Sequence, residues 1–299
     1  MSTRVAVIAH TGKTLDGGLD ELRRLITGEE IDELIWYEVP KSRKAPKKVR
    51  KALDAKPDLL VIWGGDGMVQ RCLDTVALAE AEVRTVIIPA GTANLFAHNL
   101  DIPEDLAEAV RIGFHGRDRR IDLGRLTADH GDAEHFAVMA GVGFDANMID
   151  DADGSLKDRL GRLAYIWTGA KEIGLKAVPM KIKLDGTTWF DGDATCVLVG
   201  NVAKVFGPVE VFEGATPDDG WLDIGVTTAQ GPVEWSRALA RISTGPSDKS
   251  PYVRTARAKR ISVKLAKPLR FEVDGGARTK VSRVRVAVVA GVVTARVPA

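Results

Sequence analysis

A glycine-rich turn with one aspartate is the segment of this sequence best suited to chemistry. Residues 61–70 read Val-Ile-Trp-Gly-Gly-Asp-Gly-Met-Val-Gln, so Gly64, Gly65 and Gly67 surround Asp66. Adjacent glycines after an apolar strand let the chain turn sharply and bring bare backbone close to a ligand. The helix expected next would direct its free N–H groups and the positive end of its dipole at the turn, which suits a phosphate group.

Asp66 is the unusual residue of this turn, because a carboxylate repels phosphate. It could hold Mg²⁺ through water or accept a proton from an attacking hydroxyl. The simpler alternative is a tight turn in which Asp66 only caps the helix. The four residues by themselves leave both interpretations open.

A second turn repeats the same plan. Residues 87–95 read Ile-Ile-Pro-Ala-Gly-Thr-Ala-Asn-Leu, which predicts a strand, a turn of small residues and a helix start carrying Thr92 and Asn94. Each of these two side chains could serve only as a helix cap. Two such turns at the carboxyl ends of two strands of one parallel sheet nevertheless favour a shared phosphate pocket.

The elements around these turns alternate between strands and helices. Apolar runs predict strands over 5–9, 34–39, 59–63 and 86–88, and helical patterns fall over 19–26, 46–53 and 69–81. Residues 59–63 are apolar on both faces, as strands of a buried parallel sheet are. The alternation predicts an α/β domain over residues 1–120, with helices on both faces of a parallel sheet.

Beyond residue 120 the pattern changes to closely spaced strands. They are expected over 121–126, 136–142, 180–184, 194–199, 222–227, 261–265, 269–273 and 284–289, with helices around 160–175 and 233–242. Gly, Pro and Asp turns separate them, which is typical of a mainly antiparallel β-sandwich. We therefore expect a second, β-rich domain over residues 121–286, and the final run 287–299 could return to the first domain.

Composition narrows the function classes. Of the 299 residues 45% are apolar and 28% charged, and the net charge of +1 argues against a dedicated nucleic-acid binder. Cys72 and Cys196 stand apart, so neither a disulfide framework nor a zinc site is expected. The chain starts directly with a strand pattern and has no apolar stretch long enough to cross a bilayer. We expect a cytoplasmic protein that could touch the inner membrane surface.

Six segments together resemble the bacterial lipid kinases of the diacylglycerol kinase catalytic-domain family, which is related to sphingosine and ceramide kinases and, more distantly, to NAD kinases and phosphofructokinases. In order, the segments are GGDG at 64–67, PAGTAN at 89–94, GVGFDA at 141–146, Gly200-Asn201, PDDGWLD at 217–223 and FEVDG at 271–275. The resemblance implies an NAD kinase/phosphofructokinase-like first domain and an ATP-dependent lipid kinase, with diacylglycerol the leading substrate.

The same resemblance implies the site residues. Asp66 and Asp274 would be catalytic. The ATP site would be formed by Gly64, Gly65, Asp66, Gly67, Met68, Val69 and Gln70, and Thr92 and Asn94 would complete it. Asp219 would bind Mg²⁺ together with the carbonyls of Thr216 and Trp221, since a hard cation prefers oxygen ligands. Without the resemblance, residues 218–220 would be read as an ordinary polar turn.

The sequence departs from the family pattern in three places. Met68 replaces the usual threonine after GGDG, and residues 9–13 read Ala-His-Thr-Gly-Lys in place of an Asn-Pro turn. Gly276 stands where the family has a glutamate, the candidate general base. Either Asp66 or Asp274 takes that role, or the substrate is a soluble hydroxyl compound of the NAD-kinase kind, or the protein binds nucleotide without turnover.

A basic run could bring the protein to its substrate. Residues 41–51 hold seven Lys and Arg and no acid, so Lys41 to Lys51 could contact an anionic membrane. A solvated helix face is the alternative. The run lacks the interleaved aromatic residues that stack on bases, so no nucleic-acid partner is expected. A lipid substrate is the expected partner, and a homodimer is compatible with the sequence.

Overall fold

The computed structural model describes residues 3–143, 176–206, 209–231, 233–235, 237–238 and 250–299. The chain divides into two compact units, residues 1–121 with 291–299, and residues 122–290. The expected helix over 160–175 lies outside the described residues, as does much of the one expected over 233–242. Both fold classes predicted from the sequence are confirmed, as each unit shows in turn.

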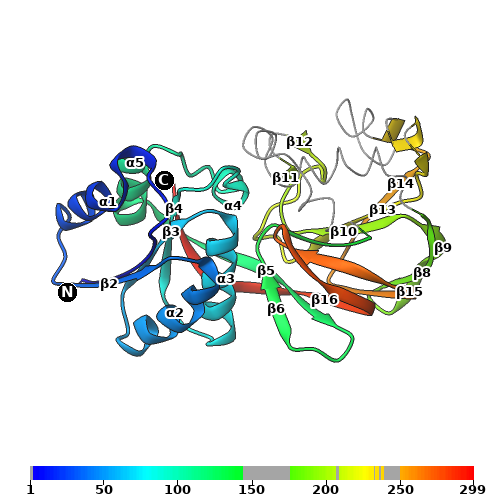
Figure 1. The fold of residues 1–299 in the computed structure, drawn as a ribbon, viewed down its shortest axis with the longest axis horizontal. Helices are drawn as coiled ribbons and strands as arrows, with labels where there is room; N and C mark the ends of the chain where they lie inside the picture. Colours follow the sequence, from blue (N-terminus) through cyan, green and yellow to red (C-terminus); the bar gives the residue numbers. More distant parts are fainter. Residues whose placement is uncertain (1–2, 144–175, 207–208, 232, 236, 239–249) are drawn as a thin grey trace. The chain divides into compact units, whose positions relative to one another are not determined.

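The first unit is a parallel sheet with helices on both faces (Figure 1). In chain order its elements are β1 (Arg4–His10), α1 (Gly18–Thr27), β2 (Glu33–Val39), α2 (Ala45–Asp54), β3 (Leu59–Gly64), α3 (Asp66–Leu78), β4 (Arg84–Pro89), α4 (Leu95–Asn99) and α5 (Leu106–His115). Short 3₁₀ turns, Leu15–Gly17 and Ser42–Lys44, precede α1 and α2. The sheet order is β2-β1-β3-β4, and all of these pairs are parallel.

Burial explains why these segments form a layered unit. β3 is buried along its whole length, and so is β1 except at its two ends, as strands covered on both faces must be. α2 buries Ala45, Val49 and Ala52, which recur at helical spacing on one side. α1 packs with α5, and α2 packs with α3. The last residues of the chain pair with β4 in parallel through Thr294 and Ala295.

The second unit is mainly antiparallel. Its strands are β5 (Arg117–Ala128, which begins in the first unit), β6 (Ala133–Phe136), β7 (Met139–Val142), β8 (Val178–Leu184), β9 (Thr187–Ala194), β10 (Cys196–Gly200), β11 (Lys204–Phe206), β12 (Val209–Glu210), β13 (Leu222–Thr227), β14 (Val253–Ala258), β15 (Arg260–Val273) and β16 (Gly276–Val297, which ends in the first unit). β15 pairs with β8 through residues 261–265 and with β7 through residues 271–273. It therefore connects the β8–β9 pair with β7, and these strands surround a common apolar core.

Two strand predictions need correction here. The segments 261–265 and 269–273 belong to one strand, β15, which is irregular between Lys264 and Leu269 and so changes partner without ending. The single strand expected over 136–142 is instead split into β6 and β7. The reason is tertiary, because the amides between the two strands donate to the side chain of Asp274.

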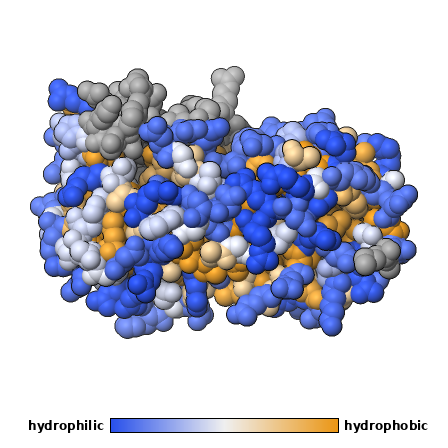
Figure 2. Space-filling model, turned by 180° about the vertical axis from the view of Figure 1, so that it is seen from behind, coloured by the Kyte–Doolittle hydropathy of each residue, from blue (hydrophilic) through white to orange (hydrophobic). Residues whose placement is uncertain are grey.

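One face of the molecule is largely polar. Hydrophilic residues predominate on the face seen in Figure 2, and apolar residues are exposed in smaller areas between them. Within the part of the chain that the structure describes, no helix is long and apolar enough to cross a membrane.

Candidate active site

The two glycine-bearing turns of the first unit lie in direct contact. They follow β3 and β4, which are neighbours in the sheet. A Cβ atom built on Gly91 would lie 2.6 Å from the Cα of Gly65, and one built on Gly65 would lie 2.9 Å from the Cα of Gly91. Only glycine allows this approach at either position. The two turns therefore contact each other through the backbone of Gly65 and Gly91, as their predicted pairing requires.

Space remains on the open side of the first turn. A Cβ atom at Gly67 would meet no described atom within 4 Å. Gly65 is the N-cap of α3, in extended conformation, so Asp66 and Gly67 belong to the first helical turn and not to the loop before it. The amides of a first helical turn have no partner within the helix and favour an anion.

Asp66 connects the two turns. The backbone N–H of Phe96, in the first turn of α4, donates to the Asp66 carboxylate at 3.3 Å. Burial raises the pKa of Asp66, and the amides of Phe96 and Leu95 partly oppose that rise. The aspartate is therefore oriented by the neighbouring helix and retains affinity for a proton.

Asn94 is fully engaged in the second turn. It is 3% exposed and has a left-handed backbone with φ 45°. Its side chain accepts from the amide of Gly91 at 2.7 Å and donates to the carbonyl of Gly91 and to Glu104. Asn94 therefore holds the shape of the turn. Thr92 is exposed on the same turn.

The residues after the first turn are buried in α3. Met68, Val69 and Gln70 are each at most 5% exposed. A Cβ on Gly64 would lie 2.6 Å from the Cβ of Met68, so the Met68 side chain packs against the end of β3. Met68 thus makes an apolar contact at the position where the resembled family has a threonine hydroxyl. The side chains of Met68, Val69 and Gln70 are buried, so these residues face the turn with their backbone.

In the second unit, Asp274 is a structural anchor. It lies in the β15–β16 turn, with a left-handed backbone at φ 44°. Its carboxylate accepts from the amides of Ala137, Val138 and Met139 at 2.8, 2.9 and 2.8 Å. These three bonds occupy both carboxylate oxygens, so Asp274 fixes the segment between β6 and β7.

That segment continues into a network of buried polar residues. Asn201, which follows β10, donates from its side-chain amide to the carbonyls of Ala137 and Asp122 at 3.0 and 2.8 Å. The Asp122 carboxylate accepts from the amide of Gly220 at 2.7 Å, and the Asp122 amide donates to the carbonyl of Pro217 at 2.6 Å. The network thus links three segments singled out in the sequence, around Asp274, Asn201 and Asp219.

Comparisons with known proteins agree with this architecture. Residues 6–126 match the profile of the "Diacylglycerol kinase catalytic domain", and residues 137–295 match the "YegS C-terminal NAD kinase beta sandwich-like domain". A Stenotrophomonas maltophilia protein named "Probable lipid kinase YegS-like" is 30% identical over 86% of this chain and 85% of its own length. The chain belongs to the diacylglycerol kinase family of lipid kinases.

Relatives and solved structures support this membership. A "Diacylglycerol kinase" of Staphylococcus epidermidis is 26% identical, over 80% of this chain and 74% of its own. A solved diacylglycerol kinase structure from Bacillus anthracis covers 98% of this chain and 96% of that one, with a TM-score of 0.77 and 21% identity, which shows the shared fold. As a member of this kinase family, the protein is a phosphotransferase that acts on an alcohol group and uses ATP.

In the turn expected to bind a metal, the negative charge of Asp219 is already paired with an arginine. Asp219 accepts from the amide of Trp221 at 2.9 Å, and its other carboxylate oxygen is ion-paired with Arg257. Thr216 lies 3.5 Å from the same oxygen. The described residues contain no group of three or more His, Cys, Asp or Glu that could hold a metal ion. A divalent cation at Asp219 would have to compete with the guanidinium group of Arg257. Binding of Mg²⁺ by Asp219 with the carbonyls of Thr216 and Trp221 stays a prediction.

Sequence reasoning missed three polar residues of this kinase. Asp122 and Arg257 read as parts of ordinary strands, and only the fold brings them to the turn at residues 217–221. Glu272 had a signal, since it is an acidic residue between Phe271 and Val273, which both enter the core. Burial raises the pKa of Glu272 to about 8, with a smaller contribution from the nearby charge of Asp274.

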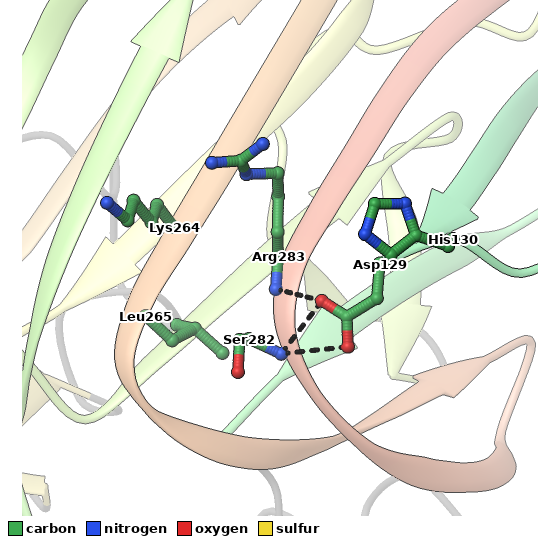
Figure 3. Close-up of a pocket in the computed structure, with 6 residues that line it drawn as sticks. All are labelled: Asp129, His130, Lys264, Leu265, Ser282 and Arg283. Atoms are coloured by element: carbon green, nitrogen blue, oxygen red, sulfur yellow. Dashed lines mark hydrogen bonds between the residues drawn. The ribbon is translucent and has the colours of Figure 1, made fainter.

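A small pocket elsewhere in the second unit contains none of the predicted site residues. It is lined by Asp129, His130, Lys264, Leu265, Ser282 and Arg283. Figure 3 shows the Asp129 carboxylate against the backbone amides of Ser282 and Arg283, with bonds of 2.8 to 3.2 Å. Asp129 thus ties the end of β5 to β16, and the pocket is best explained as structural.

Proposed function

We propose that this protein phosphorylates the hydroxyl of diacylglycerol, with Asp66 as a catalytic residue. The observation that supports this most is the contact between the two glycine turns, with Asp66 oriented across them by the Phe96 amide. Phosphoryl transfer depends mainly on positioning and on neutralising charge. The backbone amides at the helix N-terminus can neutralise phosphate charge, and the partly buried carboxylate of Asp66 can position Mg²⁺ or the incoming hydroxyl.

ATP would lie with its phosphates over the first turn. Gly64, Gly65 and Gly67 would provide close backbone approach, and the first amides of α3 would face the phosphate oxygens. Met68, Val69 and Gln70 would contribute their backbone and support the helix. Thr92 would offer its exposed hydroxyl, and Asn94 would hold the second turn in place. Mg²⁺ would enter with ATP, and Asp66 would hold it through water or position the incoming hydroxyl.

A transfer assay tests this proposal. Purified protein is incubated with γ-labelled ATP, Mg²⁺ and mixed micelles containing diacylglycerol, and labelled lipid is measured. Asp66→Asn should lower the rate at least about a hundredfold with nucleotide binding retained. Asp105→Asn is the matched control, because the Asp105 side chain only caps α5 by accepting from Glu108.

The outcomes separate the alternatives. Labelled diacylglycerol that disappears in Asp66→Asn but persists in Asp105→Asn supports the proposal. Label on a soluble hydroxyl compound, formed without micelles, would favour the NAD-kinase-like alternative. ATP binding with no transfer to any acceptor would mean a nucleotide-binding protein without turnover.

We also propose that α2 brings the protein to anionic membrane. The apolar side of α2 is buried, and Lys47, Arg50 and Lys51 are exposed on its other side. Lys41, Arg43 and Lys44 are exposed in the segment just before the helix. The ammonium groups of Lys48 and Lys51 lie 5.1 and 5.5 Å from the centre of the Tyr37 ring. A one-sided cationic helix is attracted to anionic lipid by about 1 kcal/mol per residue.

Vesicle binding tests this second proposal. Replacing Lys44, Lys47 and Arg50 together by Ala should weaken binding to phosphatidylglycerol vesicles roughly a hundredfold and leave transfer to micellar lipid much less affected. The matched control replaces Lys183, Lys264 and Arg285, which are exposed on strands β8, β15 and β16. Equal losses in both triple variants would mean that only total charge matters.

A further inference from the structure

The segment between α4 and α5 brings an acidic side chain back to the second glycine turn. The amides of Leu100 and Ile102 both donate to the carbonyl of Ala97 at 3.0 Å, so the chain reverses direction where α4 ends. The side chains of Leu100 and Ile102 are buried and anchor the reversed chain. Glu104 follows this reversal and reaches back to α4.

One carboxylate oxygen of Glu104 contacts two polar side chains. Its Oε1 accepts from the side-chain amide of Asn94 at 2.9 Å and lies 3.2 Å from Nε2 of His98. Asn94 immediately precedes α4 and His98 belongs to its last turn, so Glu104 contacts both ends of this helix. Neither Glu104 nor His98 belongs to the segments that carry the family resemblance.

Asn94 connects Glu104 to the glycine turns. It is buried and has a left-handed backbone, which a residue other than glycine keeps only where its surroundings hold it. Its side chain is held on one side by the amide and carbonyl of Gly91 and on the other by Glu104. Gly91 in turn lies against Gly65 of the first turn. A series of direct contacts therefore joins Glu104 to both turns.

The helix that Glu104 contacts also supplies the groups that act on Asp66. The amide of Phe96 donates to the Asp66 carboxylate at 3.3 Å. Burial raises the pKa of Asp66, and the amides of Phe96 and Leu95 and the nearby His98 oppose that rise. Because these three residues all belong to α4, the placement of α4 determines how Asp66 is oriented.

We infer that Glu104 is a positioning residue of the phosphoryl-transfer reaction, which holds α4 and the second glycine turn through His98 and Asn94 and so fixes the orientation of Asp66. This inference rests on the proposed function. The side chain of Glu104 is 52% exposed, so its loss should disturb the site more than the core. Transfer is sensitive to such a change, because the reacting groups must be held in a narrow range of geometries.

Steady-state kinetics in the micelle assay test this role. Glu104→Ala should lower kcat roughly ten- to a hundredfold, since small misplacements of a reacting group have effects of this size. The KM for ATP should stay within about twofold of the wild-type value, because Glu104 contacts Asn94 and His98, whereas the phosphates would lie over the backbone of the first turn. Glu104→Gln keeps an oxygen that can accept from both side chains and should recover most of kcat.

Two further measurements separate positioning from a general effect. Glu108→Ala is the matched control, because Glu108 is 42% exposed on α5 and pairs with Arg111 in the neighbouring turn of that helix; both kinetic constants should stay at wild-type values. In a double-mutant cycle, adding Glu104→Ala to Asp66→Asn should lower the remaining rate by less than about twofold, since the group that Glu104 orients is already lost.

Several results would overturn the inference. A wild-type kcat in Glu104→Ala would show that Asp66 is oriented without Glu104, with the kinase activity still standing. A raised KM for ATP with unchanged kcat would assign Glu104 to nucleotide binding instead. A loss in Asp66→Asn as large as that in the wild-type background would show that Glu104 does not act through Asp66. If the wild-type protein transfers phosphate to no lipid, the proposed function fails and the inference fails with it.

Discussion

Because Glu272 is buried, we predict that the free energy of unfolding depends on pH in a way that can be measured without an activity assay. In the unfolded chain the carboxyl group titrates near its ordinary value of 4.5, and in the folded protein burial raises its pKa to about 8. Between these two values the folded state keeps a proton that the unfolded state has released. Stability therefore falls as pH rises through this window, and Glu272→Gln removes that loss.

The magnitude follows from the two pKa values. Each pH unit between them corresponds to about 1.4 kcal/mol, so the complete effect is roughly 5 kcal/mol as an upper limit. Between pH 5.5 and 8.5 the free energy of unfolding of the wild-type protein should fall relative to that of Glu272→Gln by about 3 kcal/mol.

Urea unfolding at several pH values measures this difference. Cys196→Ala is the control, because it disturbs the same sheet face without removing a carboxyl group, and its stability relative to wild type should not vary with pH. If the difference between wild type and Glu272→Gln stays constant from pH 5.5 to 8.5, Glu272 ionises freely. The argument that burial raises the pKa of Glu272 would then be refuted.

Three further predictions follow from the two units. Gly91→Ala should lower the free energy of unfolding by about 1–3 kcal/mol, measured by thermal unfolding, because the new Cβ would meet Gly65. The rate of phosphoryl transfer should fall at least about tenfold. Wild-type activity would contradict the contact between the two turns. Asp274→Asn keeps the left-handed turn but loses amide bonds, so urea unfolding should show a loss of about 2 kcal/mol; an unchanged midpoint would contradict the anchor role. Arg257→Gln frees the Asp219 carboxylate, so the melting temperature of this variant should rise on addition of Mg²⁺, whereas that of the wild-type protein should not. A rise in the wild-type protein would mean that the metal displaces Arg257.

Local sequence was enough for the fold class and for the first glycine turn. Strand β3 is apolar on both faces, and Gly64 to Gly67 follow it, so the period of the apolar residues and the conformational freedom of glycine predicted a parallel sheet with a sharp turn. The antiparallel second unit was predicted from short strands between turn residues in the same way. Strand periodicity and turn residues are patterns of a few neighbouring residues, so the sequence alone was enough to predict these elements.

Only the tertiary structure decided what the polar residues do. Asp274 accepts hydrogen bonds from the amides of residues 137–139, more than a hundred positions away in the chain, and its predicted catalytic role stays a prediction. Arg257 reaches Asp219 because β14 pairs with β13 in the fold. Glu272 lies among apolar residues in the sequence, but its lack of partners is a property of the packed sheet. Local patterns specify strands, helices and turns, whereas the partner of a buried charge depends on contacts between distant segments.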